Sequence, residues 1–331
     1  MDKELQSKVT ILVNSCDAYE DLWRPFFTLF KKYWDPEGVR VLLNTDSKEF
    51  RFDGLSIECV HPENAGDPYG KRMIHALSQV RTPYVIPMLD DFFLRKEVDL
   101  ELIGRIVDWM DKDRHIVYFN CDCTQTHYDY EVGVYPGFRR LPRGNEYILN
   151  MQAAVWRTEK LLGYWRPDIT PWEWETVTNL LAARNRKDKF YCVTDPRYAF
   201  CDYGFKLEGM GVFRGKWVKD DVVPLFEKEN IRVDYSKRGF YAPESIILQE
   251  SKLRDRLKTK FEPSELIKRC LGRKESARHL RFLKKNKVLG LFPDRDFIYL
   301  KYTLASEYKK FTYNRAIIDR IATVLRIKRH A

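Results

Sequence analysis

Short apolar runs alternate with helical periods along the first 120 residues, and this alternation restricts the fold strongly. Continuous runs of β-forming residues occupy 8–14, 38–47, 55–62 and 83–89. Residues 21–33 and 71–80 instead repeat their apolar side chains at helical spacing. Strands that are apolar throughout are typical of sheets buried on both faces. The order therefore predicts an α/β fold, a mostly parallel sheet flanked by helices.

The rest of the chain has a less regular pattern. We expect a helix over 100–110, a strand over 115–121, substrate-contacting loops over 122–150, and helices over 150–162 and 172–184. Beyond about residue 245, apolar side chains recur at helical spacing among lysines and arginines. This change predicts an α/β domain over 1–245 and a basic helical region over 246–331.

The basic charge of the chain lies in its last 81 residues. Residues 251–331 hold 23 Lys and Arg against 8 Asp and Glu, a net charge of +15 within a total of +10. The other 250 residues hold 35 basic and 40 acidic side chains, a net charge of −5. A tail that mixes cations with apolar side chains suits an anionic membrane surface. Nucleic acid is the competing anion, but no nucleic-acid motif is visible, and a helical bundle with a solvated basic face is the structural alternative.

Two classes of protein are disfavoured. No apolar run approaches the roughly 18 residues of a membrane-spanning helix, and the N-terminus has no secretory pattern. The seven cysteines lack metal-ligand spacing, because one residue separates Cys121 from Cys123 and no second pair follows. We therefore expect no zinc site, and reduced thiols in a cytoplasmic protein.

Polar and acidic residues follow three of the expected strands. The first strand ends at Asn14 and leads to Asp17, the second leads to Asp46, and residues 83–89 lead to the adjacent Asp90 and Asp91. Ligands bind outside the carboxyl ends of parallel strands. These side chains are therefore expected to meet at one site.

The adjacent Asp90 and Asp91 are the most unusual of these residues. Two neighbouring carboxylates repel each other and cost free energy to desolvate. The apolar strand before them and Phe92 and Phe93 after them indicate a buried position. Such a pair is expected to meet a cation, because Mg²⁺ and Mn²⁺ take carboxylate oxygens together with substrate phosphate oxygens. A solvated cap of the next helix is the alternative.

Residues 8 to about 220 resemble the GT-A type of sugar-nucleotide-dependent glycosyltransferases, in particular the family-2-like bacterial enzymes of capsular and O-antigen polysaccharide synthesis. The stretch VTILVNSCDAYEDLW is similar to the first nucleotide-binding strand of that family, and LLNTDS and GDPYGKRMIHAL are similar to its later nucleotide-contacting segments. The adjacent acids stand where the family commonly has Asp-x-Asp. The resemblance implies a GT-A (Rossmann-like) catalytic domain over 1–245. It implies these donor-binding residues: Asn14, Asp17, Asp46, Lys71 or Arg72, and Asp90. It also implies Asp91 as the ligand of Mg²⁺ or Mn²⁺.

The resemblance also implies a catalytic base. The stretch TPWEWETVTNLL, 170–181, stands where inverting members carry this carboxylate. Inversion needs a base that removes the proton of the attacking acceptor hydroxyl. Glu173 or Glu175 is implied, with Glu173 favoured, and only one can face the cleft because positions two apart do not share a helix face. A helix cap is the alternative.

The stretch GVFRGKW, 211–217, carries two more candidate donor-binding residues. Arg214 and Lys216 surround Gly215. A basic loop of this kind can neutralise a leaving diphosphate, and a solvated turn is the equal alternative.

Together these features predict a peripheral-membrane glycosyltransferase at the inner face of the cell membrane. It would move a sugar, with inversion, from a nucleoside diphosphate to a saccharide acceptor, either free or lipid-linked. One alternative is a sugar nucleotidyltransferase, which normally has a Gly-rich phosphate loop that NSCDAYED lacks. The other is a non-catalytic module that tethers a complex to the membrane.

Overall fold

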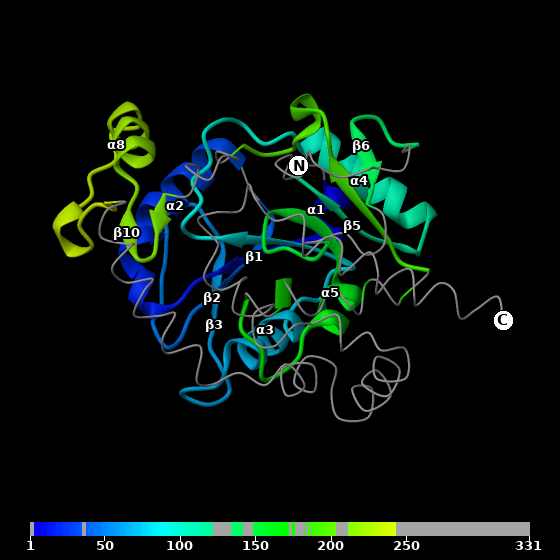
Figure 1. The fold of residues 1–331 in the computed structure, drawn as a ribbon, viewed down its shortest axis with the longest axis horizontal. Coiled ribbons are helices and arrows are strands. Elements are labelled where there is room, and N and C mark those ends of the chain that lie inside the picture. The colour runs from blue at the N-terminus through cyan, green and yellow to red at the C-terminus, as the bar shows by residue number, and fades with distance from the viewer. Residues whose placement is uncertain are drawn as a thin grey trace, which may run out of the picture. The chain divides into compact units, whose positions relative to one another are not determined.

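The computed structural model describes residues 3–34, 38–121, 134–141, 148–171, 174–175, 182, 185, 187–202 and 211–242 (Figure 1). The chain divides into two compact units. The first comprises Met1–Leu141, Met151–Gly163 and Lys187–Tyr241, and the second comprises Pro142–Asn150, Tyr164–Arg186 and Ala242–Ala331. The expected domain boundary at residue 245 stays a prediction, and the basic region beyond it lies outside the described residues.

Within the described residues, a sheet of eight strands organises the first unit, in the order β3-β2-β1-β4-β7-β5-β8-β6. Its strands are β1 (Val9–Asn14), β2 (Arg40–Asn44), β3 (Ile57–Val60), β4 (Tyr84–Leu89), β5 (Ile116–Asn120), β6 (Phe138–Arg140), β7 (Ala154–Arg157) and β8 (Lys189–Val193). Strand β1 runs parallel to β2 and β4, β2 to β3, and β5 to β8, while β6 and β7 are antiparallel to their neighbours. The predicted mostly parallel α/β sheet is confirmed.

Helices cover both faces of this sheet (Figure 1). They are α1 (Lys3–Lys8), α2 (Glu20–Trp34), α3 (Tyr69–Ser78), α4 (Leu100–Lys112) and α5 (Thr158–Tyr164), and a short 3-10 turn, η1 (Asp17–Tyr19), precedes α2. Beyond the sheet, the hairpin of β9 (Val212–Phe213) and β10 (Lys216–Trp217) leads into α8 (Lys219–Lys228). The helices expected before residue 121 all form, with ends shifted by no more than two residues.

The core follows the two-residue alternation of the strands. Val9, Ile11 and Val13 of β1 pack into one large cluster with α2 and α4. On the opposite face, the Asn44 side-chain nitrogen lies 3.6 Å from the sulfur of Met73 in α3. Each central strand therefore buries side chains on both faces, as its continuous apolar run predicts.

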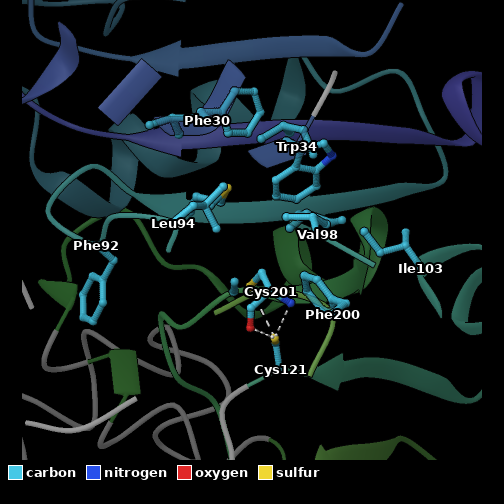
Figure 2. Close-up of a cluster of buried hydrophobic side chains, with 14 of the residues drawn as sticks. Phe30, Trp34, Phe92, Leu94, Val98, Ile103, Cys121, Phe200 and Cys201 are labelled. Atoms are coloured by element: carbon cyan, nitrogen blue, oxygen red, sulfur yellow. Dashed lines mark hydrogen bonds between the residues drawn. The ribbon is translucent and has the colours of Figure 1, made fainter. Parts of the chain in front are cut away.

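Figure 2 shows the part of this core between α2 and the segment after β4. Phe30 and Trp34 of α2 lie above Leu94 and Val98. Below them, the sulfurs of the free cysteines Cys121 and Cys201 lie 3.3 Å apart. The chain that follows Asp91 is thus anchored in the core, and this anchoring holds the acidic pair at a fixed depth.

Two expectations for the second half of the sheet are wrong. Residues 154–157 form β7 rather than a helix, and the helix begins only at Thr158. Strand β7 pairs antiparallel with both β4 and β5, and a short apolar run cannot be told from a buried helix by periodicity alone. Residues 138–140, expected within a loop, form the short edge strand β6 beside β8. Most of the helix expected over 172–184 lies outside the described residues, although Trp174 and Glu175 are helical.

Candidate functional site

The strand order reverses at β1, and this reversal positions the site. From β1 the chain adds β2 and β3 on one side and then returns to place β4 on the other. A crevice forms at such a point, outside the carboxyl ends of the strands. Asn14, the last residue of β1, is in register with Leu89, the last residue of β4. Ser15 and Asp90 are therefore the first residues beyond the two strand ends.

Asp90 is buried, with 4% of its surface exposed. Its carboxylate accepts a hydrogen bond from the Ser15 hydroxyl. That hydroxyl oxygen in turn accepts one from the indole Nε1 of Trp23 in α2, at 2.6 Å. Burial and the adjacent Asp91 raise the pKa of Asp90 well above its usual range, while the Ser15 bond and the nearby Arg238 lower it. The carboxyl group is thus held in one orientation at a high electrostatic cost.

Asp91 presents its carboxyl group beside that of Asp90 and is half-buried. Burial raises the pKa of Asp91 to about 7, although its own N–H and Arg238 lower it. In the part of the chain that the structure describes, no other side chain is hydrogen bonded to this carboxylate. The Asp91 oxygens are therefore available to a cation or to a hydrogen-bond donor of a ligand.

The backbone at Asp91 depends on a close approach by Gly211. The Asp91 carbonyl accepts a hydrogen bond from the Gly211 N–H at 2.7 Å. A Cβ atom at position 211 would lie 2.1 Å from the Phe93 ring, closer than two such carbon atoms can approach. Only glycine lets these two segments meet without displacing the ring.

Asp17 holds the loop after β2 in place. Its carboxylate accepts hydrogen bonds from the backbone N–H groups of Asp46, Ser47 and Lys48, at 3.0, 3.1 and 3.2 Å, and from the Ser47 hydroxyl at 2.6 Å. Burial raises the pKa of Asp17, but these bonds outweigh it and lower the pKa to about 2. The structure thus places the Asp17 carboxylate against this loop, where its bonds are internal to the protein.

Asp46 is joined to Arg72 of α3. The Asp46 Oδ1 atom lies 2.6 Å from an Arg72 guanidinium nitrogen, and its Oδ2 atom accepts the Asp17 N–H at 2.8 Å. Another Arg72 nitrogen donates to the Ser15 carbonyl at 3.1 Å. Lys71, in contrast, pairs with Asp67 at 3.4 Å. Of the two basic candidates in α3, the structure brings Arg72 to the strand ends.

Asn14 supplies an unsatisfied polar group beside these acids. Its Oδ1 atom accepts a hydrogen bond from the Asn44 side chain at 3.3 Å. Its Nδ2 atom is buried and has no hydrogen-bond partner among the residues described. A buried donor without a partner is rare in proteins, and a ligand oxygen would satisfy it.

Arg238 is a member of the site that the sequence did not indicate. Its side chain is only 8% exposed, and its Nε donates to the Asp21 carboxylate at 2.7 Å. It also donates to the Ala18 carbonyl at 2.6 Å and lies 4.3 Å above the centre of the Tyr19 ring. It is the cation that acts on both Asp90 and Asp91. Because 217 positions separate Arg238 from Asp21, no local sequence pattern marks it.

Arg214, Lys216, Glu173 and Glu175 are the remaining candidates. Arg214 lies in the turn between β9 and β10, Lys216 is the first residue of β10, and the Lys216 ammonium donates to the Arg238 carbonyl at 3.2 Å. Glu175 belongs to the second unit. Glu173 lies outside the described residues.

The chemistry of the site is that of a carboxylate pair with one neighbouring guanidinium. In the described ranges, no group of three or more His, Cys, Asp or Glu side chains is placed so that it could hold a metal ion. Asp90 and Asp91 therefore fit a hard cation only if a ligand supplies further oxygens. Within the same ranges, no helix is both long and apolar enough to cross a membrane.

No family model and no curated protein sequence matches the chain. Among solved structures, it is similar to a fragment of S. aureus TarS bound to UDP-GlcNAc, at 13% identity over 98% of this chain and 92% of that one, with a TM-score of 0.38. It is also similar to CMP:2-keto-3-deoxy-manno-octonic acid synthetase with CTP, at 11% identity over 56% and 89% and a TM-score of 0.32. A third similar structure is an active-site mutant of LgtC, at 14% identity over 46% and 59% and a TM-score of 0.29. All three likenesses are below a TM-score of 0.5, so the site itself must support any function.

Proposed function

We propose that this chain is a glycosyltransferase that moves a sugar from a nucleoside diphosphate to a saccharide acceptor in the synthesis of a surface polysaccharide, capsule or O-antigen. The observation that carries the proposal is the pair Asp90 and Asp91 at the reversal of strand order. A carboxylate pair with raised pKa values costs folding free energy, and such pairs concentrate at functional sites. A phosphate-bearing substrate with its cation would supply the charge that this pair needs.

The ends of β1 and β2 would hold the nucleotide. Asp46 is oriented by Arg72 and by the N–H of Asp17, and its side chain is 41% exposed. Each of its oxygens therefore keeps a lone pair for a hydroxyl or N–H donor of the ribose or base. The unpaired Nδ2 donor of Asn14 lies at the end of the neighbouring strand. Fixed polar groups of this kind orient a ligand without a large entropic cost.

The carboxylate pair suits Mg²⁺ or Mn²⁺, and we assign Asp91 as the protein ligand. Its oxygens accept no bond from another described side chain, whereas Asp90 is already bonded to Ser15. These cations are commonly bound by one or two carboxylates together with substrate phosphates. The bound cation would offset the charge of the leaving diphosphate.

The acceptor side of the reaction is assigned from the resemblance. Glu173 or Glu175 would remove the proton of the acceptor hydroxyl and give inversion. The basic residues beyond 245 would hold the enzyme at the inner face of an anionic membrane, where a lipid-linked acceptor is located.

A binding screen tests the donor class. The full chain is heated with UDP, UDP-GlcNAc, GDP, CMP and dTDP, each with Mn²⁺ or with EDTA. A ligand at 100 times its dissociation constant stabilises the fold by about 2.7 kcal/mol, so one nucleotide is expected to raise the melting temperature, and more so with Mn²⁺. If no nucleotide raises it, the donor class is refuted.

Turnover of the selected sugar nucleotide is then compared between two aspartate variants. Asp91→Asn is expected to lose turnover and keep its fold. Asp108→Asn, which changes an exposed aspartate on α4, is the matched control and should keep the wild-type rate. Wild-type turnover by Asp91→Asn would remove that residue from the mechanism.

A further inference from the structure

A basic groove lies at the junction of α2 with the β9–β10 hairpin, and Arg238, whose charge acts on Asp90 and Asp91, lines it. Its volume is about 440 Å³, and it is open to solvent. Pockets for small molecules typically have about 300–1,000 Å³. The groove is lined by Ala18, Asp21, Arg214, Gly215, Lys216, Lys237 and Arg238. Four of these seven residues are cationic and one is acidic.

The single acid of the groove is already neutralised. Arg238 binds the Asp21 carboxylate through its Nε and a terminal nitrogen, and a further nitrogen donates to the Gly215 carbonyl at 3.3 Å. The buried Arg238 therefore forms the wall that joins α2 to the hairpin. Figure 1 shows β10 and α8 beside α2, as these contacts require. Lys216 and Lys237 therefore contribute positive charge to the groove.

In the part of the chain that the structure describes, the ammonium groups of Lys216 and Lys237 form no ion pair, although the charge of Lys237 acts on the nearby Asp234. Within the described residues, neither lies within 4.0 Å of a carboxylate oxygen, and both residues are exposed. Most surface lysines of a mixed-charge protein can find an acid nearby at little cost, so two such lysines in one groove leave a local positive potential. Clefts lined by one sign of charge concentrate counter-ions.

The turn that carries Arg214 places this cation at a conformational cost. Arg214 and Gly215 both have positive φ angles, 51° and 79°, and connect β9 to β10 as a two-residue loop. Such type I′ turns favour Asn followed by Gly. An arginine in the left-handed region is uncommon and strained. Folding alone would favour asparagine here, so the arginine is a candidate for ligand contact.

We infer that this groove binds a phosphate group of a substrate, with Arg214, Lys216 and Lys237 as its cations. The inference rests on the proposed function, because both possible sources of the phosphate are substrates of the proposed glycosyl transfer. That source is either the diphosphate of the donor or a phosphate on the acceptor. Arg238 connects the groove with the acidic pair, because it lines the groove and its charge acts on Asp90 and Asp91. A ligand in the groove would thus lie next to the acidic pair.

Pyrophosphate binding to the full chain, measured by titration calorimetry at low salt, tests the groove without any turnover. Arg214→Asn removes one cation and installs the residue that the turn favours, so this variant folds. Lys237→Gln removes another, and Arg24→Gln changes an exposed arginine of α2 outside the groove. A charge-assisted bond is worth about 1.5 kcal/mol or more, so each groove variant should weaken binding about tenfold. The control should bind as the wild type does.

Competition identifies the source of the phosphate. Displacement of pyrophosphate by the nucleoside diphosphate, and not by a sugar phosphate, assigns the groove to the donor. The reverse result assigns it to the acceptor. Pyrophosphate that does not bind, or that binds equally to wild type and both groove variants, overturns the inference. The two proposals can fail separately. If pyrophosphate binding depends on Arg214 and Lys237 but the chain transfers no sugar, the proposed function is refuted and phosphate binding by the groove is supported.

Discussion

Replacing Asp91 by asparagine should stabilise the protein, and the gain should grow with pH. The folded pKa of Asp91 is about 7, against an ordinary value of 3.8. Below about pH 4 the group is protonated in both the folded and the unfolded chain, so its carboxyl group costs nothing. Between these two pKa values the unfolded chain loses a proton that the folded chain keeps, and stability falls as pH rises. Above pH 7 the cost is constant.

The size of the effect follows from the shift in pKa. The difference of about 3 units corresponds to about 4 kcal/mol at full ionisation, since each unit is worth about 1.36 kcal/mol. Water that reaches this half-buried group screens it, and we expect about half of that value, about 2 kcal/mol, at pH 8. At pH 5, which is about 1.2 units above the unfolded pKa, only that part of the pKa difference contributes. With the same screening, the expected stabilisation by Asp91→Asn is then about 0.8 kcal/mol.

Urea unfolding in EDTA, followed by tryptophan fluorescence at pH 5 and pH 8, measures both values. Asp91→Asn should unfold at a higher urea concentration than the wild type, with the larger difference at pH 8. Asp108→Asn should show no such pH dependence. A stability gain that is equal at the two pH values, or a loss of stability at pH 8, would refute the claim that the ionised carboxylate of Asp91 destabilises the folded protein.

Two further variants test the scaffold of the site. Asp17→Asn should destabilise the protein at pH 7 by about 2 kcal/mol, because the folded pKa of about 2 is lowered from 3.8. Urea titrations should show this difference shrink as pH falls from 4 through 2, and a difference of full size at pH 2 would contradict the hydrogen-bonding explanation. Gly211→Ala should lower the melting temperature and weaken nucleotide binding, because its Cβ would overlap the Phe93 ring; an overpacked contact costs about 1–3 kcal/mol. Gly163→Ala, in a helix with open space around it, is the control and should be neutral or slightly stabilising. A Gly211→Ala variant as stable as the wild type would refute the close-approach argument.

Local sequence patterns were sufficient for the first half of the sheet. Strands β1, β2, β4 and β5 are short apolar runs that the sheet buries almost completely, and each forms where its run predicts. Strand β3 also forms within its predicted run, although Glu58 in it is exposed. Strand β7 is different, because its four residues are a strand only through pairing with β4 and β5. A segment of four residues holds too little periodic information to select its partners, and tertiary packing decides it.

The same division applies to the candidate site. The sequence determined that acids follow the strands, because a strand end must return the chain to a polar environment and parallel strands bring such ends together. Only the tertiary structure decided what each acid does: Asp17 is bound within the protein, whereas the half-buried Asp91 carboxylate accepts no hydrogen bond from another described side chain. Arg238 reaches this site from 217 positions beyond Asp21. Contacts at that separation depend on how the whole chain folds, and no local run of residues encodes them.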